Sequence, residues 1–165
     1  MTATVAQIKE RLCAMALLLP APTVIRSAHA NRPRALQPPQ LPALVIETGS
    51  GVYNFTDESE TVVKTTRQYL LTLYVQQLTQ GREGDAEAAV DAYADAFRDY
   101  MAARDGLQLD TAPLPRALAG VRARMVDDTG FIALYYPINQ QTTAYAAVGF
   151  TLSVDTFHAV VYRGG

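Results

Sequence analysis

The sequence is poor in the side chains that build disulfides and zinc sites. Its 165 residues include one cysteine, Cys13, and two histidines, His29 and His158. A disulfide needs two cysteines and a structural zinc site needs about four cysteine or histidine ligands, so one chain builds neither. Long apolar runs are also lacking. None reaches the roughly 18 residues that a membrane-spanning helix needs, so we expect no membrane partner.

The sequence motifs of several enzyme classes are missing as well. There is no G-x-S-x-G, no P-loop, no H-E-x-x-H and no G-x-G-x-x-G before a helix. Cys13 lies in an apolar stretch, where a thiol usually acts as a small apolar side chain. Neither histidine has a Ser, Cys or acidic residue in a motif that would make it a general base. We therefore predict no enzyme activity, no catalytic residue, no metal and no cofactor.

The numbers of basic and acidic residues are nearly equal. Fourteen Lys and Arg residues against sixteen Asp and Glu residues give a net charge of -2. Proteins that coat a polyanion are strongly basic, so binding of nucleic acid over the whole surface is disfavoured.

The N-terminal residues fit two interpretations, of which the first is a secretion signal. Lys9 and Arg11 precede an apolar stretch at 12–25, and residues 28–30 (Ala-His-Ala) have the form of a signal-peptidase site. A secreted protein beginning at Asn31 is therefore one alternative.

The second interpretation is an amphipathic helix, which we favour. Glu10 lies among the basic residues, and Arg26 lies between the apolar stretch and the cleavage motif. Thr4 is placed to cap this helix and Pro20 to end it. Its apolar residues recur at intervals of three and four: Val5, Ile8, Leu12, Met15 and Leu19. We therefore expect the whole chain to be the mature protein, made and used in the cytosol.

Six prolines between residues 20 and 42 predict an extended, exposed arm or loop. Its charges are all positive, because Arg26, Arg32 and Arg34 lie there without an acidic residue. These arginines either belong to a solvated loop or meet an acidic partner surface or nucleic acid. No aromatic residues lie between them, which weakens the nucleic-acid alternative.

The rest of the chain predicts one α+β domain over residues 1–165, with a mostly antiparallel sheet and helices packed on one face. Period-two patterns and turn residues predict strands at 44–48, 61–78, 121–126, 131–136 and 144–154. A second helix is predicted at 85–104, with Asp85 as its cap and Gly106 as its stop. Its Asp91 and Asp95 lie one turn apart, and we assign them to a solvated face rather than to a metal site.

Connections between these elements are predicted from glycine and from charge. Residues 49–51 (Gly-Ser-Gly) are expected to end the first strand, and residues 121–136 to form a hairpin around Gly130. The strand at 61–78 begins hydrophilic on both faces, so its start is expected to project beyond the core or to pair elsewhere. Residues 107–109 fit a short strand, and residues 157–162 fit a last strand or a docked edge.

Five segments together carry a resemblance to a known family. They are residues 41–49 (LPALVIETG), the strand at 67–75, the glycine-bounded helix, and the closing segments at 130–136 and 145–154. In their order and local texture they resemble the tail terminator (tail completion, minor tail) proteins of long-tailed bacteriophages. The resemblance extends from about residue 5 to residue 154 and includes no diagnostic motif.

The resemblance implies a structural virion protein at the junction of tail and neck, made in the host cytoplasm. Proteins of this family form a hexameric ring that caps the tail tube, stops its polymerisation and provides the surface for head–tail joining. The implied partners are further copies of the chain, the tail tube protein and a neck or head-completion protein. DNA only passes through the lumen, which an acidic average charge would suit.

The candidate interface consists of charged residues from two segments. Arginine pairs well with carboxylates in a planar, bidentate geometry, so we expect salt bridges between subunits or with a partner. The six candidates are Arg26, Arg32, Arg34, Asp57, Glu58 and Glu60. The simpler alternative is that all six are solvated loop charges. Alternative functions are a neck or head-completion protein of the same particle, and a small enzyme or ligand-binding domain whose pocket has no sequence motif.

Overall fold

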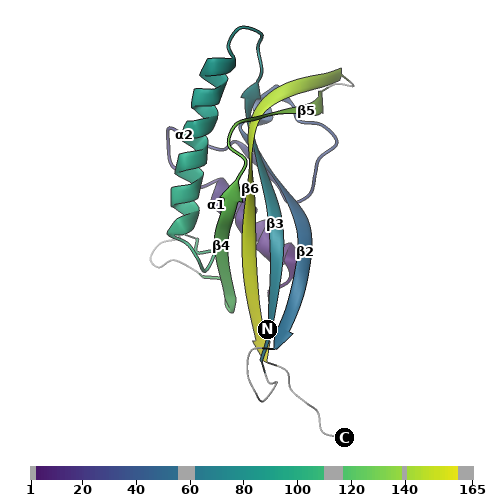
Figure 1. Ribbon diagram of the computed structural model, residues 1–165, viewed down its shortest axis with the longest axis vertical. Helices are drawn as coiled ribbons and strands as arrows, with labels where there is room; N and C mark the ends of the chain where they lie inside the picture. The colour runs from purple at the N-terminus through teal and green to yellow at the C-terminus, as the bar shows by residue number, and fades with distance from the viewer. Residues whose placement is uncertain (1–2, 56–61, 110–116, 139–140, 160–165) are drawn as a thin grey trace, which may run out of the picture.

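The computed structural model describes residues 3–55, 62–109, 117–138 and 141–159 (Figure 1). Its elements follow in this order: α1 (Val5–Ala16), β1 (Ser27–His29), a short 3-10 helix (Pro38–Gln40), β2 (Ala43–Phe55), β3 (Val62–Gln77), α2 (Glu83–Ala102), β4 (Val121–Asp128), β5 (Ile132–Ile138) and β6 (Gln141–Ala159). They form a single α+β domain, as predicted.

One mixed sheet contains all six strands, in the order β1-β2-β3-β6-β4, with β5 also paired to β6. Only the short pair of β1 and β2 is parallel, and the other pairs are antiparallel. The sheet is therefore mostly antiparallel, as the short connections between successive strands predict.

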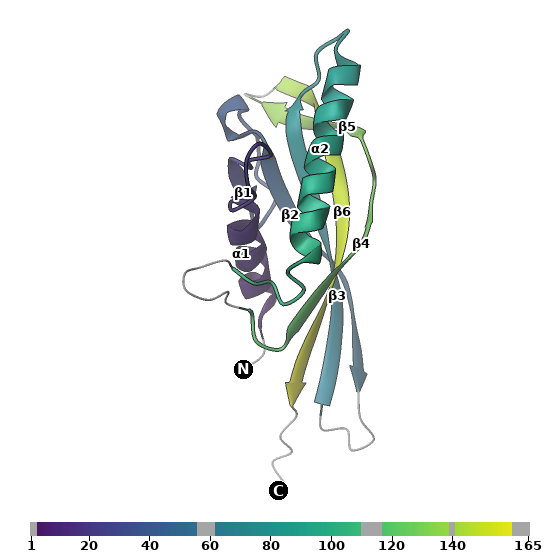
Figure 2. The same ribbon diagram turned by 90° about the vertical axis from the view of Figure 1, so that its left-hand side faces the viewer.

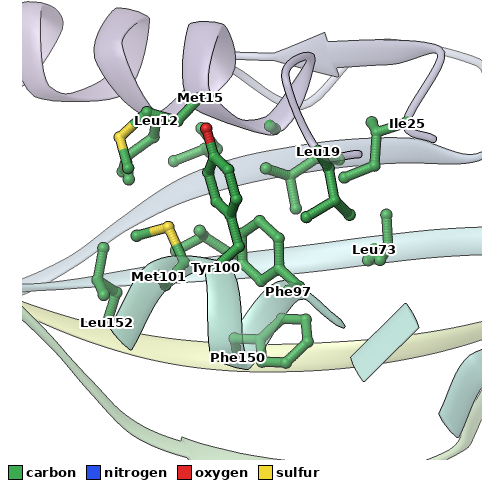
Figure 3. Packing of buried hydrophobic residues seen from close by; sticks show 14 of the residues in the cluster. Leu12, Met15, Leu19, Ile25, Leu73, Phe97, Tyr100, Met101, Phe150 and Leu152 are labelled. Atoms are coloured by element: carbon green, nitrogen blue, oxygen red, sulfur yellow. The ribbon is translucent and has the colours of Figure 1, made fainter. Parts of the chain in front are cut away.

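Both helices cover the same face of this sheet (Figure 2). Side chains from α1, α2 and the central strands meet between the two layers, where the rings of Phe97 and Phe150 lie 5.0 Å apart (Figure 3). The period-two patterns that predict strands at 61–78 and 144–154 also separate the two faces of β3 and β6. Buried on the helix side are Tyr69, Leu71, Leu73 and Val75 of β3 and Ala146, Val148, Phe150, Leu152 and Val154 of β6.

The predicted cap of the first helix is confirmed. The Thr4 hydroxyl accepts a hydrogen bond from the Gln7 amide at 3.2 Å, and the Gln7 side chain accepts one from the Thr4 amide at 2.9 Å. This reciprocal pair satisfies two amides that the helix leaves free. The second helix differs from the prediction: it begins at Glu83, so Asp85 lies in its first turn rather than at its cap.

The predicted exposed arm at residues 20–42 is packed against the sheet instead. Ile25, Leu36 and Leu41 are buried, and β1 within this segment pairs with β2. The prolines do not prevent this pairing, because β1 itself contains none. Leu36 and Leu41 of this segment belong to a second, smaller apolar cluster on the face opposite the helices. Its other members come from β2, β3 and β6: Ala43, Val45, Tyr74, Tyr145 and Ala147.

The glycines at 49 and 51 do not end β2, contrary to the prediction. The strand continues to Phe55 through a one-residue shift in register between Thr48 and Gly51. The Arg67 guanidinium packs over this bulge, where a Cβ on Gly51 would lie 2.9 Å from Cζ, and donates to the Gly49 carbonyl at 3.3 Å. A bulge accommodates the glycines that a regular strand disfavours.

The predicted hairpin of residues 121–136 is wrong. β4 pairs with β6 up to Asp128↔Phe150, and β5 pairs with β6 from Ile132↔Ala147, so both strands follow the same edge of β6 in series. The 19-residue β6 is long enough to pair with both. It also includes residues 157–159, which are therefore not a separate last strand; residues 160–162 lie outside the described residues. No regular strand forms at 107–109.

Three strands project beyond the helices. The C-terminal ends of β2 and β6 and the start of β3 extend past both α1 and α2 (Figures 1 and 2). The hydrophilic start of β3 predicts this projection. This projection places the end of β2 at one tip of the described structure.

Candidate functional site

The arginines predicted for an interface are exposed. Arg26 immediately precedes β1, and Arg32 and Arg34 lie on the segment between β1 and the 3-10 helix. The predicted acidic partners Asp57, Glu58 and Glu60 lie outside the described residues.

Arg26 lies near one end of β2. β1, which follows Arg26, pairs with Ala43–Val45 there, and β2 continues to Phe55, about 30 Å further at roughly 3.3 Å per residue. Salt bridges between the three arginines and the acidic residues stay a prediction, because the acidic residues lie outside the described residues.

One open strand edge was missed by the sequence reasoning. β1 covers β2 only over Ala43–Val45, and the outer side of β2 from Glu47 to Phe55 has no backbone partner within the described residues. These nine positions contain no lysine and no proline, and Glu47 is their single charge. Such an edge is a template for another strand. The β-forming residues Val52, Tyr53 and Phe55 after the glycines were the signal in the sequence.

The opposite edge of the sheet, at β4, is better protected. A bulge interrupts β4 between Met125 and Asp127. The Ala123 amide already donates a hydrogen bond of 2.6 Å to the Asp105 carbonyl. Bulges, capping loops and charged side chains all make a strand edge less able to pair with another strand.

A groove of about 900 Å³ runs along β4, between the end of α2 and the neighbouring strands. Four of its eight charged side chains form two ion pairs. Lys64 lies 3.2 Å from Asp155, which also accepts a 2.6 Å hydrogen bond from Thr66. Arg98 donates to Asp128, and this hydrogen bond is the main reason why the pKa of Asp128 lies below its usual range.

Two arginines of this groove lie outside these two ion pairs. Arg122 and Arg124 are exposed on β4, and neither has a hydrogen-bonded or ion-paired side chain in the described part of the protein. They alternate with Val121 and Ala123, which belong to the helix-side core, so their side chains lie on the face opposite the helices. Sequence reasoning missed these two residues, because a lone pair of arginines in a strand has no distinctive pattern.

A second hollow, of about 220 Å³, lies between the start of α1 and the projecting strands. Tyr69 and His158 line it, and each has a buried polar atom without a hydrogen-bond partner in the described structure: the Tyr69 hydroxyl and His158 Nδ1. Burial raises the pKa of Tyr69. Neither atom is accessible from the hollow, so neither offers a ligand contact.

Cys13 and the two histidines lie on separate elements, namely α1, β1 and the end of β6. Burial raises the pKa of the Cys13 thiol and lowers that of His29, whose ring lies 3.2 Å from the Ser27 hydroxyl. Among the described residues, no three His, Cys, Asp or Glu side chains are grouped to hold a metal ion. No helix in the described ranges is long and apolar enough to cross a membrane.

No protein-family model matches the sequence, and no curated protein is significantly similar to it.

Proposed function

We propose that this protein forms a ring that caps the tail tube of a long-tailed bacteriophage, ends tube polymerisation and provides the surface for head–tail joining. The proposal combines the family resemblance of the sequence with an assembly surface in the fold. The ring is expected to be a hexamer, as the resemblance implies.

The open outer edge of β2 is the observation that carries this proposal. It lies on a three-stranded projection that extends beyond the helices, where no other part of the described chain covers it (Figure 1). An unpaired strand edge favours contact with another chain. A head-to-tail contact closes into a ring when the rotation from one copy to the next divides a full turn.

The alternative functions are a neck or head-completion protein and a ligand-binding domain. A neck or head-completion protein would share the assembly behaviour but bind the portal side of the particle. The groove along β4 favours a ligand-binding domain as the second candidate, because it is large and several polar groups line it, among them Lys64, Arg122 and Asp155.

Negative-stain electron microscopy of the purified full-length chain tests the proposal. Images over a range of concentrations, alone and with the candidate tail tube protein, are expected to show closed rings and capped tube ends. Tube protein alone is the control, since its tubes should continue to lengthen. A chain that stays monomeric and leaves tube length unchanged would rule out the terminator function and direct attention to the other two candidates.

A further inference from the structure

We infer that the groove along β4 is a binding site for a phosphate-bearing small molecule, whose phosphate group lies between Arg122 and Arg124. The inference goes beyond the proposed ring and does not depend on it. It rests on two arginines that have no ion-paired or hydrogen-bonded partner in the described structure, and on the hydroxyl group beside them.

The register of the sheet places the two arginines in adjacent rows on the face opposite the helices. Arg122 lies opposite Asp155 of β6, and Arg124 lies opposite Ser153. Two residues of a strand advance about 6.6 Å along it, at roughly 3.3 Å per residue. Both long side chains can therefore reach one anion that lies beside the Ser153 hydroxyl.

The acidic neighbour of Arg122 is held by β3 instead of by β4. Asp155 accepts a hydrogen bond of 2.6 Å from Thr66 and lies 3.2 Å from Lys64, and both partners belong to β3. Lys64 thereby compensates the charge of Asp155. Arg122 forms no ion pair with Asp155, although the two residues are cross-strand neighbours. Its guanidinium group is therefore available to an anion from solution.

The number of donors favours a phosphate over a carboxylate. A carboxylate has two oxygens, which one guanidinium group satisfies in a bidentate geometry. Two guanidinium groups are present here, and the Ser153 hydroxyl also has no hydrogen-bond partner among the described residues. A phosphate monoester supplies three acceptor oxygens and up to two negative charges. The groove volume of about 900 Å³ is typical of small-molecule sites and has space for the rest of such a ligand.

Asp127 provides a test with the opposite sign. Because the bulge after Met125 shifts the alternation of β4 by one residue, Asp127 follows Arg124 on the same face, opposite Thr151. It is exposed and forms no ion pair in the described part of the chain. Its carboxylate repels an anion bound at Arg124, so Asp127→Asn should bind phosphate more tightly.

Titration of inorganic phosphate with the full-length chain, followed by phosphorus NMR at constant ionic strength, tests the site. Arg122→Gln and Arg124→Gln are each expected to raise the Kd roughly tenfold or more. Asp127→Asn is expected to lower the Kd, which a loss of folding would not do. The matched control is Arg26→Gln with Arg34→Gln, which removes two exposed arginines away from β4 and should bind like the unmodified chain.

Three results would overturn the inference. The first is an unmodified chain that does not bind phosphate, and the second is equal binding by the β4 variants and the control. The third is binding of a single-stranded oligonucleotide without binding of inorganic phosphate, which would assign the arginines to a nucleic-acid strand rather than to a small molecule. Ring formation is observed separately by electron microscopy, so a failure of the ring and a failure of this site are distinguishable.

Discussion

Tyr69 and Tyr145 are both fully buried, but only one of their hydroxyls has a partner. The Tyr145 hydroxyl donates to the Leu36 carbonyl at 3.2 Å, whereas the Tyr69 hydroxyl has none within the described residues. An unsatisfied buried hydroxyl costs free energy, and a satisfied one contributes about 1 kcal/mol. We expect Tyr69→Phe to raise the free energy of unfolding by about 1 kcal/mol and Tyr145→Phe to lower it by a similar amount. Urea denaturation measures both. A loss of stability in Tyr69→Phe would show that the hydroxyl is satisfied after all.

The pair of Arg98 and Asp128 makes stability depend on pH. Because the hydrogen bond from Arg98 lowers the pKa of Asp128 in the folded protein, the pair stabilises the fold above the usual carboxyl pKa, and the effect is lost as the pH falls through the lowered value. Both side chains are partly exposed, so Asp128→Asn should lower the free energy of unfolding at pH 7 by less than about 1 kcal/mol.

The difference in free energy of unfolding between Asp128→Asn and the unmodified protein should shrink once the pH falls below the pKa range of carboxyl groups. Asp127→Asn is the matched control, because Asp127 is exposed and has no ion pair in the described part of the chain. Urea unfolding at several pH values gives both curves. A constant difference from neutral to acidic pH would show that the ion pair is not its source.

At the scale of whole elements, periodicity predicted the buried faces of β3 and β6 because each of these strands has one apolar and one polar face over most of its length. It did not predict that β2 continues past Gly49. Glycine permits a turn and a bulge equally, and the packing of Arg67 over the bulge is a contact between strands that one segment does not reveal. The prediction of a hairpin around Gly130 was wrong for a similar reason. β4 pairs with β6 rather than with the neighbouring β5, and the residues of the segment itself do not reveal that pairing.

Two glycines at element boundaries should respond oppositely to the same substitution. Gly120, before β4, has a φ of 67°, and a Cβ there would lie 3.0 Å from the Phe157 carbonyl oxygen. Gly120→Ala is therefore expected to lower the free energy of unfolding by about 1 kcal/mol or more. Gly84 lies in the first turn of α2 with open space around it, so Gly84→Ala should raise stability by up to about 1 kcal/mol. Thermal unfolding of the two variants gives the comparison, and a stabilising Gly120→Ala would contradict the strain argument.

At the scale of the whole molecule, the sequence predicted the fold class but not the edges of the sheet. Which strands lie outermost depends on their spatial order, and β6, last in the chain, pairs in the middle. The arginines of residues 26–34 were visible in the sequence, but the strand β1 that they flank was not. Arg122 and Arg124 stood out only once β4 was known to be an edge strand on which neither side chain has a hydrogen-bonded or ion-paired partner among the described residues.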